Sequence, residues 1–113
     1  MSEEKIKNIL GMAQRARLIV SGNLAVEEAI KKGKVKMLIV AEDANDATIE
    51  ALKKVSAENE IPMIKILTKE KLGKALGKEY RAVAALLEQG FCNSLNKIIA
   101  KKSSVEEKVN VKK

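Results

Sequence analysis

Three short segments contain the residues of this 113-residue chain whose types and spacing could do chemistry. The most direct candidate for catalysis is the adjacent pair Glu42 and Asp43, which follows a continuous apolar run. Two carboxylates could bind a hard metal ion, or one of them could act as a general base. No third ligand and no nucleophile stands near them in sequence, so we favour a structural role in which they pair with nearby lysines. An enzyme that uses them is the least favoured of our hypotheses.

The second segment, residues 21–24, reads Ser-Gly-Asn-Leu and lies between a predicted strand and a predicted helix. The first backbone N–H groups of a helix have no partner within the helix and lie at its positive pole, so they attract phosphate. Gly22 would let a ligand approach the backbone closely. The same sequence also fits an ordinary capped start of a helix, so both interpretations stay open.

The third segment, residues 77–81, precedes the last predicted strand and combines a flexible glycine, two cations and one of the two aromatic residues of the chain. Tyr80 and Arg81 have the kinds of side chain that stack on unpaired bases, while cations contact phosphate. The alternative is a loop whose tyrosine covers the edge of the core, and the segment alone does not separate the two.

The composition excludes several classes of function. The chain has no His and a single cysteine, Cys92. A Ser-His-Asp or Cys-His hydrolase, a His-ligated metal site, an internal disulfide and a thiolate zinc cluster are therefore excluded. No apolar run approaches the roughly 20 residues that span a bilayer, and the first residues lack the layout of a signal peptide. We expect a cytoplasmic protein that is not an enzyme and uses no metal, no cofactor and no membrane.

The net charge of +7 is unevenly distributed along the chain. Residues 14–36 hold six basic and two acidic residues, a net +4, and residues 65–81 hold the same numbers. Residues 37–64 between them hold two basic and six acidic residues, a net −4. If the strands near residues 20 and 84 are neighbours, the two basic blocks could form one surface that attracts a phosphate backbone. Lysine-rich helix faces that serve only solubility are the alternative.

The spacing of apolar residues changes period along the chain and predicts alternating helices and strands. Such alternation implies a sheet between two helix layers, although the strand order is not readable. We expect Asp46 or Thr48 to cap the third helix and Thr68 to cap the fourth. The predicted strands are 18–20, 37–41, 63–67 and 82–87, and the predicted helices are 3–16 and the segments around Val26–Ile30, Ile49–Val55, Leu72–Leu76 and Phe91–Ile99.

A series of short phrases follows a recognisable order along the chain. They are Gln14-Arg15-Ala16-Arg17, Val20-Ser21-Gly22, Ala29-Ile30 with Gly33, Ala41-Glu42-Asp43-Ala44, Ile61-Pro62, Leu72-Gly73, Gly77-Lys78-Glu79 and Gln89-Gly90-Phe91. In this order and spacing the chain resembles the ribosomal L7Ae/L30e superfamily of kink-turn RNA-binding proteins, most of all its small bacterial branch, over roughly residues 4–100. The resemblance implies an α/β fold, a single-domain three-layer α-β-α sandwich around a mixed four-stranded sheet.

The resemblance also implies a mode of binding. In this family the N-terminal end of the second helix enters the opened major groove of a sharply bent RNA, and a loop before the last strand covers an unstacked nucleotide. Both elements coincide with the two glycine-containing segments described above. At the helix pattern of the family, this chain keeps Gly22 but has Leu24, Ala25 and Glu28 where relatives have asparagine, glutamate and lysine.

We therefore predict a non-enzymatic RNA-binding protein of the ribosomal type, with structured RNA of kink-turn-like or ribosomal kind as its partner and the ribosome as a further candidate. Residues 1–100 would form the RNA-binding domain and residues 101–113 a flexible basic tail, and we expect a monomer. The alternative is a protein-interaction scaffold of the translation or transcription machinery with weak, generic affinity for RNA. The predicted RNA-binding residues are Gly22, Asn23 and Leu24 at the helix start, Arg17, Lys31, Lys78 and Arg81 as phosphate contacts, Tyr80 as a base contact, and Glu79, which would orient the loop.

Overall fold

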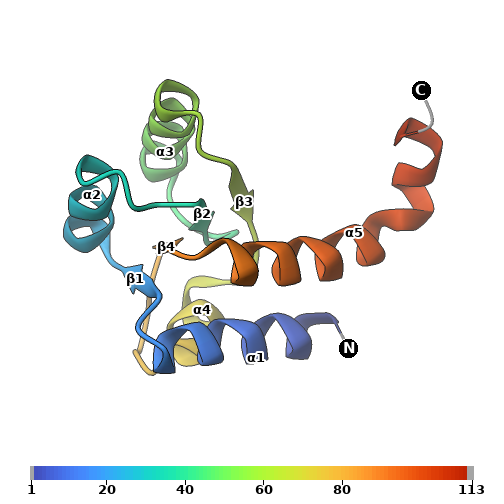
Figure 1. Cartoon of the computed structure of the whole chain (residues 1–113), viewed down its shortest axis with the longest axis horizontal. Coiled ribbons are helices and arrows are strands. Elements are labelled where there is room, and N and C mark those ends of the chain that lie inside the picture. Colours follow the sequence, from blue (N-terminus) through green and yellow to red (C-terminus); the bar gives the residue numbers. More distant parts are fainter. Residues whose placement is uncertain (1, 112–113) are drawn as a thin grey trace.

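The computed structural model alternates helices and strands along the chain, as the apolar spacing predicts (Figure 1). It describes the backbone of residues 2–111 and the side chains of residues 3–100. The strands are β1 (Ile19–Ser21), β2 (Met37–Val40), β3 (Met63–Lys65) and β4 (Val83–Leu86). The helices are α1 (Ser2–Arg15), α2 (Asn23–Lys31), α3 (Asp46–Asn59), α4 (Lys69–Ala75) and α5 (Gln89–Val111).

Over the described backbone, the strands form one mixed sheet in the order β1-β4-β2-β3. β4 is antiparallel to both of its neighbours, whereas β2 runs parallel to β3. β2 and β4 occupy the middle of the sheet, and every residue in them is buried. Central strands that are covered by helices on both faces are apolar throughout, which is why each of the two is a continuous apolar run in the sequence.

Two helix layers cover the sheet (Figure 1). α1, α4 and α5 lie on one side, with α1 against β1 and α5 against β4. α2 covers β1 and β4 on the other side, and α3 covers β2 and β3. The core between the layers is aliphatic, and Leu10, Leu38 and Leu86 in it are fully buried. The prediction of a three-layer α-β-α sandwich around a mixed four-stranded sheet is confirmed.

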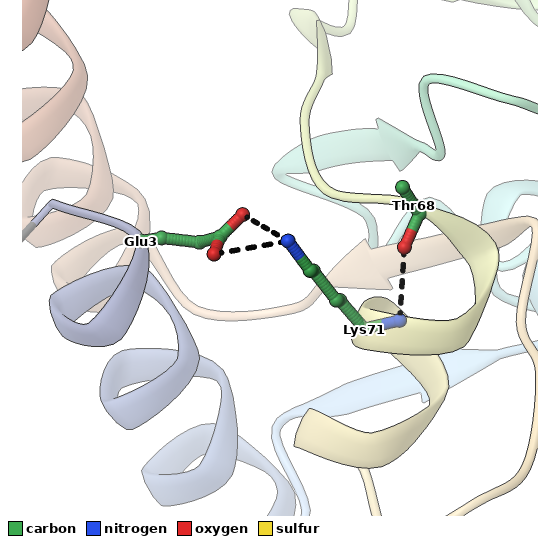
Figure 2. Close-up of polar contacts among 3 residues, drawn as sticks. All are labelled: Glu3, Thr68 and Lys71. Carbon is green, nitrogen blue, oxygen red and sulfur yellow. Dashed lines mark hydrogen bonds and ion pairs between the residues drawn. The ribbon is translucent and has the colours of Figure 1, made fainter.

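The helix caps agree with the sequence prediction in one case and differ from it in another. Thr68 caps α4 as predicted, since its Oγ1 accepts a hydrogen bond from the backbone N–H of Lys71 at 3.2 Å (Figure 2). For α3 the prediction of Asp46 or Thr48 is wrong. Asn45 is the N-cap, and its Oδ1 accepts a hydrogen bond from the backbone N–H of Thr48 at 2.8 Å. The extended backbone at Asn45 suits an N-cap, so Asp46 is the first residue of the helix and not its cap.

α4 lies alongside α1 and comes close to it near both of its own ends. The Nζ atom of Lys71 binds the carboxylate of Glu3 at 3.0 and 3.2 Å (Figure 2). Further along the two helices, a Cβ atom at Gly11 would lie 3.7 Å from the carbonyl oxygen of Ala75. The exposed ion pair contributes at most about 1 kcal/mol. The close approach at Gly11 shows that the two helices remain packed together up to the end of α4, which precedes the loop at residues 77–81.

The last helix, α5, continues along the described backbone to Val111. Side chains of residues 101–113 lie outside the described part of the chain, and the predicted flexible basic tail at 101–113 stays a prediction. None of the described helices combines the length and the apolar character needed to cross a membrane.

Candidate functional site

The two glycine-containing segments lie side by side at one end of the sheet. β1 and β4 are antiparallel neighbours, so the end of β1 lies beside the start of β4 (Figure 1). The backbone N–H of Gly22 donates a hydrogen bond to the carbonyl of Val83 at 3.1 Å. The Nε atom of Arg81 donates to the Oγ atom of Ser21 at 2.8 Å. We call this surface the corner and define it as residues 21–25 and 77–81.

The helix start in the corner has no side-chain cap. Gly22 is the N-cap of α2 with a φ of 92° and a ψ of 151°, a conformation that residues with a side chain rarely adopt. Among the side chains that the structure describes, none caps the first N–H groups of α2, and its first turn contains no acidic residue. Asn23 and Leu24, the first two helical residues, are exposed. The positive pole of α2 therefore opens to solvent beside Arg81, in a geometry that suits an anion.

The loop in the corner is packed onto α4 through backbone contacts. A Cβ atom at Gly73 of α4 would lie 2.7 Å from the carbonyl carbon and oxygen of Glu79 and 2.8 Å from the Cα of Tyr80. The backbone N–H of Lys78 donates to the carbonyl of Gly73 at 2.8 Å. Because the neighbouring atoms belong to the backbone, only glycine fits at position 73 without a shift of the loop. The helix thus fixes the path of the loop.

A chain of hydrogen bonds extends from the loop after β2 to the end of β1. The Oδ1 atom of Asp43 accepts a hydrogen bond from the backbone N–H of Lys69, the first residue of α4, at 2.8 Å. The carbonyl of Lys69 accepts one from the backbone N–H of Arg81 at 3.1 Å. Arg81 in turn reaches Ser21 through its Nε atom. Four separate parts of the chain therefore set the position of one guanidinium group.

Of the two carboxylates considered for catalysis, Glu42 is exposed and Asp43 binds the start of α4. Asp43 has the structural role favoured from the sequence, but its hydrogen-bond partner is a backbone N–H at the start of α4 and not a lysine side chain. Within the described part of the chain, no group of three His, Cys, Asp or Glu residues is placed to hold a metal ion.

Burial, with a smaller contribution from the carboxylate of Glu88, raises the pKa of the Cys92 thiol. A buried thiol of this kind is a poor nucleophile.

The outer surface of the corner presents two large apolar side chains to solvent. Leu24 is 82% exposed and Tyr80 is 61% exposed. Arg81 is half-buried, and its Nε atom and one Nη atom donate hydrogen bonds to the Oγ atom of Ser21 and the carbonyl of Tyr80. The other N–H groups of its guanidinium have no hydrogen-bond partner among the described residues, so they can donate to a ligand. Lys78 and Glu79 are exposed on the same loop. An aromatic ring, an apolar side chain and cations beside a helix pole suit the bases and phosphates of a nucleic acid.

Two of the predicted site residues lie outside the corner. Arg17 comes before β1, and Lys31 is the last residue of α2, so each lies at the far end of an element that meets the corner. β1 has three residues and α2 has nine, which corresponds to about 10 Å of strand and about 13 Å of helix. The two basic blocks of the sequence therefore do not merge at the corner, and contact of these two residues with RNA stays a prediction.

Sequence reasoning missed the roles of three residues that build the corner, although one of them, Ser21, lies in a segment that it singled out. Ser21 and Lys69 act through hydrogen bonds to Arg81, and Gly73 acts through its lack of a side chain. A glycine inside a predicted helix is disfavoured by about 1 kcal/mol relative to alanine, so it is a signal of close backbone approach. No comparable signal links Ser21 with Arg81, which are 60 positions apart.

An apolar groove of about 310 Å³ lies next to the corner, between α2 and α3. Val26 and Ile30 form one side of it, Leu52 and Val55 form the other, and Val83 contributes from the sheet. Three polar side chains also line the groove, Asn23 and Glu27 from α2 and Thr48 from α3.

The fold and the corner together define a class of protein: a small three-layer α/β domain whose candidate interface is a cationic strand-to-helix corner with a loop packed beside it. Comparison with family models gives this class its name. The model of the Ribosomal protein L7Ae/L30e/S12e/Gadd45 family matches residues 4–96. The chain belongs to this family, as the phrases in its sequence predict.

Two curated relatives are each called RNA-binding protein YlxQ. The protein from Bacillus subtilis (strain 168) is 36% identical over 87 residues, which cover 77% of this chain and 87% of the relative. The protein from Enterococcus faecium is 26% identical over 98 residues, which cover 87% of this chain and 94% of the relative.

Two solved structures share the fold. A protein of unknown function from Bacillus halodurans C has a TM-score of 0.79 and 32% identity, covering 84% of this chain and 96% of that one. The Giardia lamblia 15.5kD RNA binding protein has a TM-score of 0.70 and 22% identity, covering 88% of this chain and 86% of that one. The second likeness supports the fold alone.

Proposed function

We propose that this protein is a non-enzymatic RNA-binding protein that recognises bent, structured RNA of kink-turn-like or ribosomal kind through the corner. It would act as a monomer in the cytoplasm, in the translation machinery. The observation that carries the proposal is the hydrogen bond between Arg81 and Ser21, because it joins the loop before β4 to the start of α2. Family membership and the names of the two YlxQ relatives support RNA as the ligand.

Each part of the corner has a distinct task in this proposal. The first N–H groups of α2 and the helix dipole bind phosphate, and Lys78 and Arg81 neutralise neighbouring phosphates. Tyr80 stacks on an unpaired base, and Leu24 makes an apolar contact beside it. Glu79 orients the loop. The deep, narrow major groove of a regular RNA helix excludes side chains, so α2 enters only where the RNA is bent or unpaired.

The side chains of the first turns of α2 favour recognition by shape. Leu24 and Ala25 have no polar group that could read a base, and the exposed Glu28 repels phosphate. Backbone N–H groups, the helix dipole and the surrounding cations therefore provide the attraction. Such contacts position an RNA of suitable shape and carry little direct sequence information.

The test compares a kink-turn RNA with a straight duplex of equal length at several salt concentrations. Tyr80 is the single tyrosine and the chain has no tryptophan, so intrinsic fluorescence follows this one side chain. We expect the bent RNA to bind at least about tenfold more tightly, about 1.4 kcal/mol, and to change the fluorescence of Tyr80. Equal affinity for both RNAs would exclude recognition by shape.

Substitution of Arg81 locates the binding surface. Arg81→Ala should weaken binding and flatten the plot of log affinity against log salt by about one unit, the value of one lost phosphate contact. Lys53→Ala is a control, because that exposed lysine belongs to α3 and not to the corner. An Arg81→Ala slope equal to that of the control would remove Arg81 from the interface. A protein partner that stays bound after nuclease treatment would instead favour the scaffold alternative.

A further inference from the structure

A second group of cations lies at the end of the sheet opposite the corner. At this end β4 finishes and β2 begins, since the backbone N–H of Lys36 donates to the carbonyl of Leu86 at 2.8 Å. β1 begins there as well, because the N–H of Leu87 donates to the carbonyl of Leu18 at 2.8 Å. We call this group the distal cluster. Its members are Arg17, Lys31, Lys32, Lys34 and Lys36.

The distal cluster and the corner are separated by the length of β4. The carbonyl of Ala82 accepts a hydrogen bond from the backbone N–H of Ala41 at 2.8 Å, at the corner end of the sheet. Leu87 lies at the distal end. The five steps of extended chain between Ala82 and Leu87 correspond to about 17 Å. The two groups of cations are therefore separate surfaces, and a contact at the corner leaves the distal cluster uncovered.

All five side chains of the distal cluster are exposed. The ion pairs among the described residues involve Lys53, Lys71 and Lys74, so no member of the cluster is paired within that part of the chain. Two carboxylates also lie at this end. Glu60 lines the same hollow as Lys36 but forms no ion pair with it. The Oε1 atom of Glu88 accepts a hydrogen bond from the backbone N–H of Phe91 at 3.0 Å and caps the start of α5. The positive charge of the cluster thus has no counterion in an ion pair there.

Helix dipoles account for only part of the distal cluster. Arg17 follows the end of α1, and Lys31 and Lys32 lie at the end of α2, where a cation is favourable. Lys34 and Lys36 lie beyond both helices, in the segment that leads into β2. They add like charge to a surface that is already cationic, which is unfavourable in the unbound protein. A bound polyanion would remove this repulsion.

We propose that the distal cluster binds the phosphate backbone of a second RNA segment, so that one protein molecule holds two segments at once. The inference rests on the proposed function of the corner. It also gives Arg17 and Lys31 a place in RNA binding that the corner does not provide. The second segment is either an arm of the RNA that is bound at the corner or a separate RNA molecule, and both present the same phosphate chemistry.

The test uses the double variant Lys34→Ala with Lys36→Ala. Its matched control is Lys53→Ala with Lys54→Ala, which removes two exposed lysines from α3. Affinity is measured against salt for a kink-turn RNA with a long duplex arm and for the same RNA cut back to the bend. We expect the distal variant to flatten the salt dependence on the long-armed RNA by about one to two units, at about 0.9 per phosphate contact. On the shortened RNA it should match the control.

A capture assay separates the two sources of the second segment. An RNA bound to beads holds the protein, and a second labelled RNA is added. Loss of the labelled RNA with the distal variant, but not with the control, assigns the cluster to a separate RNA molecule. A flattened salt dependence on the long-armed RNA without such capture assigns it to the arm of the same RNA.

The failure of this inference is distinguishable from failure of the proposed function. If Arg81→Ala weakens binding to the shortened RNA but the distal variant equals the control in every assay, only the second surface is refuted. If Arg81→Ala leaves binding of the shortened RNA unchanged, the proposed function of the corner is refuted first. Thermal unfolding followed by circular dichroism confirms that each variant is folded.

Discussion

The replacement Gly73→Ala tests how the corner is built. The new Cβ atom would lie 2.7 Å from the backbone of Glu79, and ordinary van der Waals contact begins at 3.4 Å, so the loop has to move by about 0.7 Å. A shift of that size would stretch the hydrogen bond from the N–H of Arg81 to the carbonyl of Lys69 from 3.1 Å to at most about 3.8 Å, beyond a real hydrogen bond. The substitution therefore acts on the path of the loop.

The expected magnitude follows from three contributions. Overpacking costs about 1–3 kcal/mol, and loss of one backbone hydrogen bond costs about 1 kcal/mol. Replacing glycine by alanine inside a helix returns about 1 kcal/mol. We expect the free energy of unfolding to fall by about 1–3 kcal/mol, which lowers the Tm by several degrees in a domain of this size. RNA affinity should fall as well, because the displaced loop carries Tyr80 and Arg81.

Gly11→Ala is the matched control. Gly11 also lies inside a helix, α1, but its Cβ atom would be no closer than 3.6 Å to its neighbours. Only the helix propensity remains, so this variant should be more stable by up to about 1 kcal/mol and bind RNA normally. Thermal unfolding and RNA titration of both variants form the assay. A Gly73→Ala protein that is as stable as Gly11→Ala and binds RNA equally well would refute the packing of the loop on α4.

Three further predictions concern single side chains. Asp43→Ala should cost about 1 kcal/mol by removing the acceptor for the first N–H of α4, whereas Asp43→Asn keeps an oxygen there and should cost less; equal Tm values for the two would contradict this. Glu28→Lys should strengthen binding to a kink-turn RNA and steepen its salt dependence by up to about one unit, and an unchanged slope would place Glu28 outside the interface. The Cys92 thiol, whose pKa is raised chiefly by burial, should react with iodoacetamide much more slowly at pH 8 in the folded protein than in denaturant; equal rates would show that it is accessible.

The fold was largely predictable because hydrophobic periodicity reports burial directly. β2 and β4 are apolar runs because helices cover both of their faces. The α3 cap was not predictable in the same way. Asn45, Asp46 and Thr48 can all cap a helix, and the choice among them depends on which residue has the extended backbone that connects β2 to α3.

The candidate site was only partly predictable, because strand order and direction decide which cations meet. Segments 21–24 and 77–81 were found from their residue types, but their contact depends on the pairing of β1 with β4. Charge summed along the sequence takes no account of strand direction. It therefore groups Arg17 with Ser21, although the strand between them carries Arg17 away from the corner.

The most direct test of the central claim is a map of backbone amides during titration with a kink-turn RNA, recorded as NMR chemical-shift changes. If the corner binds RNA, the amide resonances of residues 22–25 and 78–81 should change together, at the same RNA concentration. The resonances of α3 should change less. Large shifts confined to α3, or changes in only one of the two segments at saturation, would contradict the claim that the helix start and the loop bind RNA as one surface.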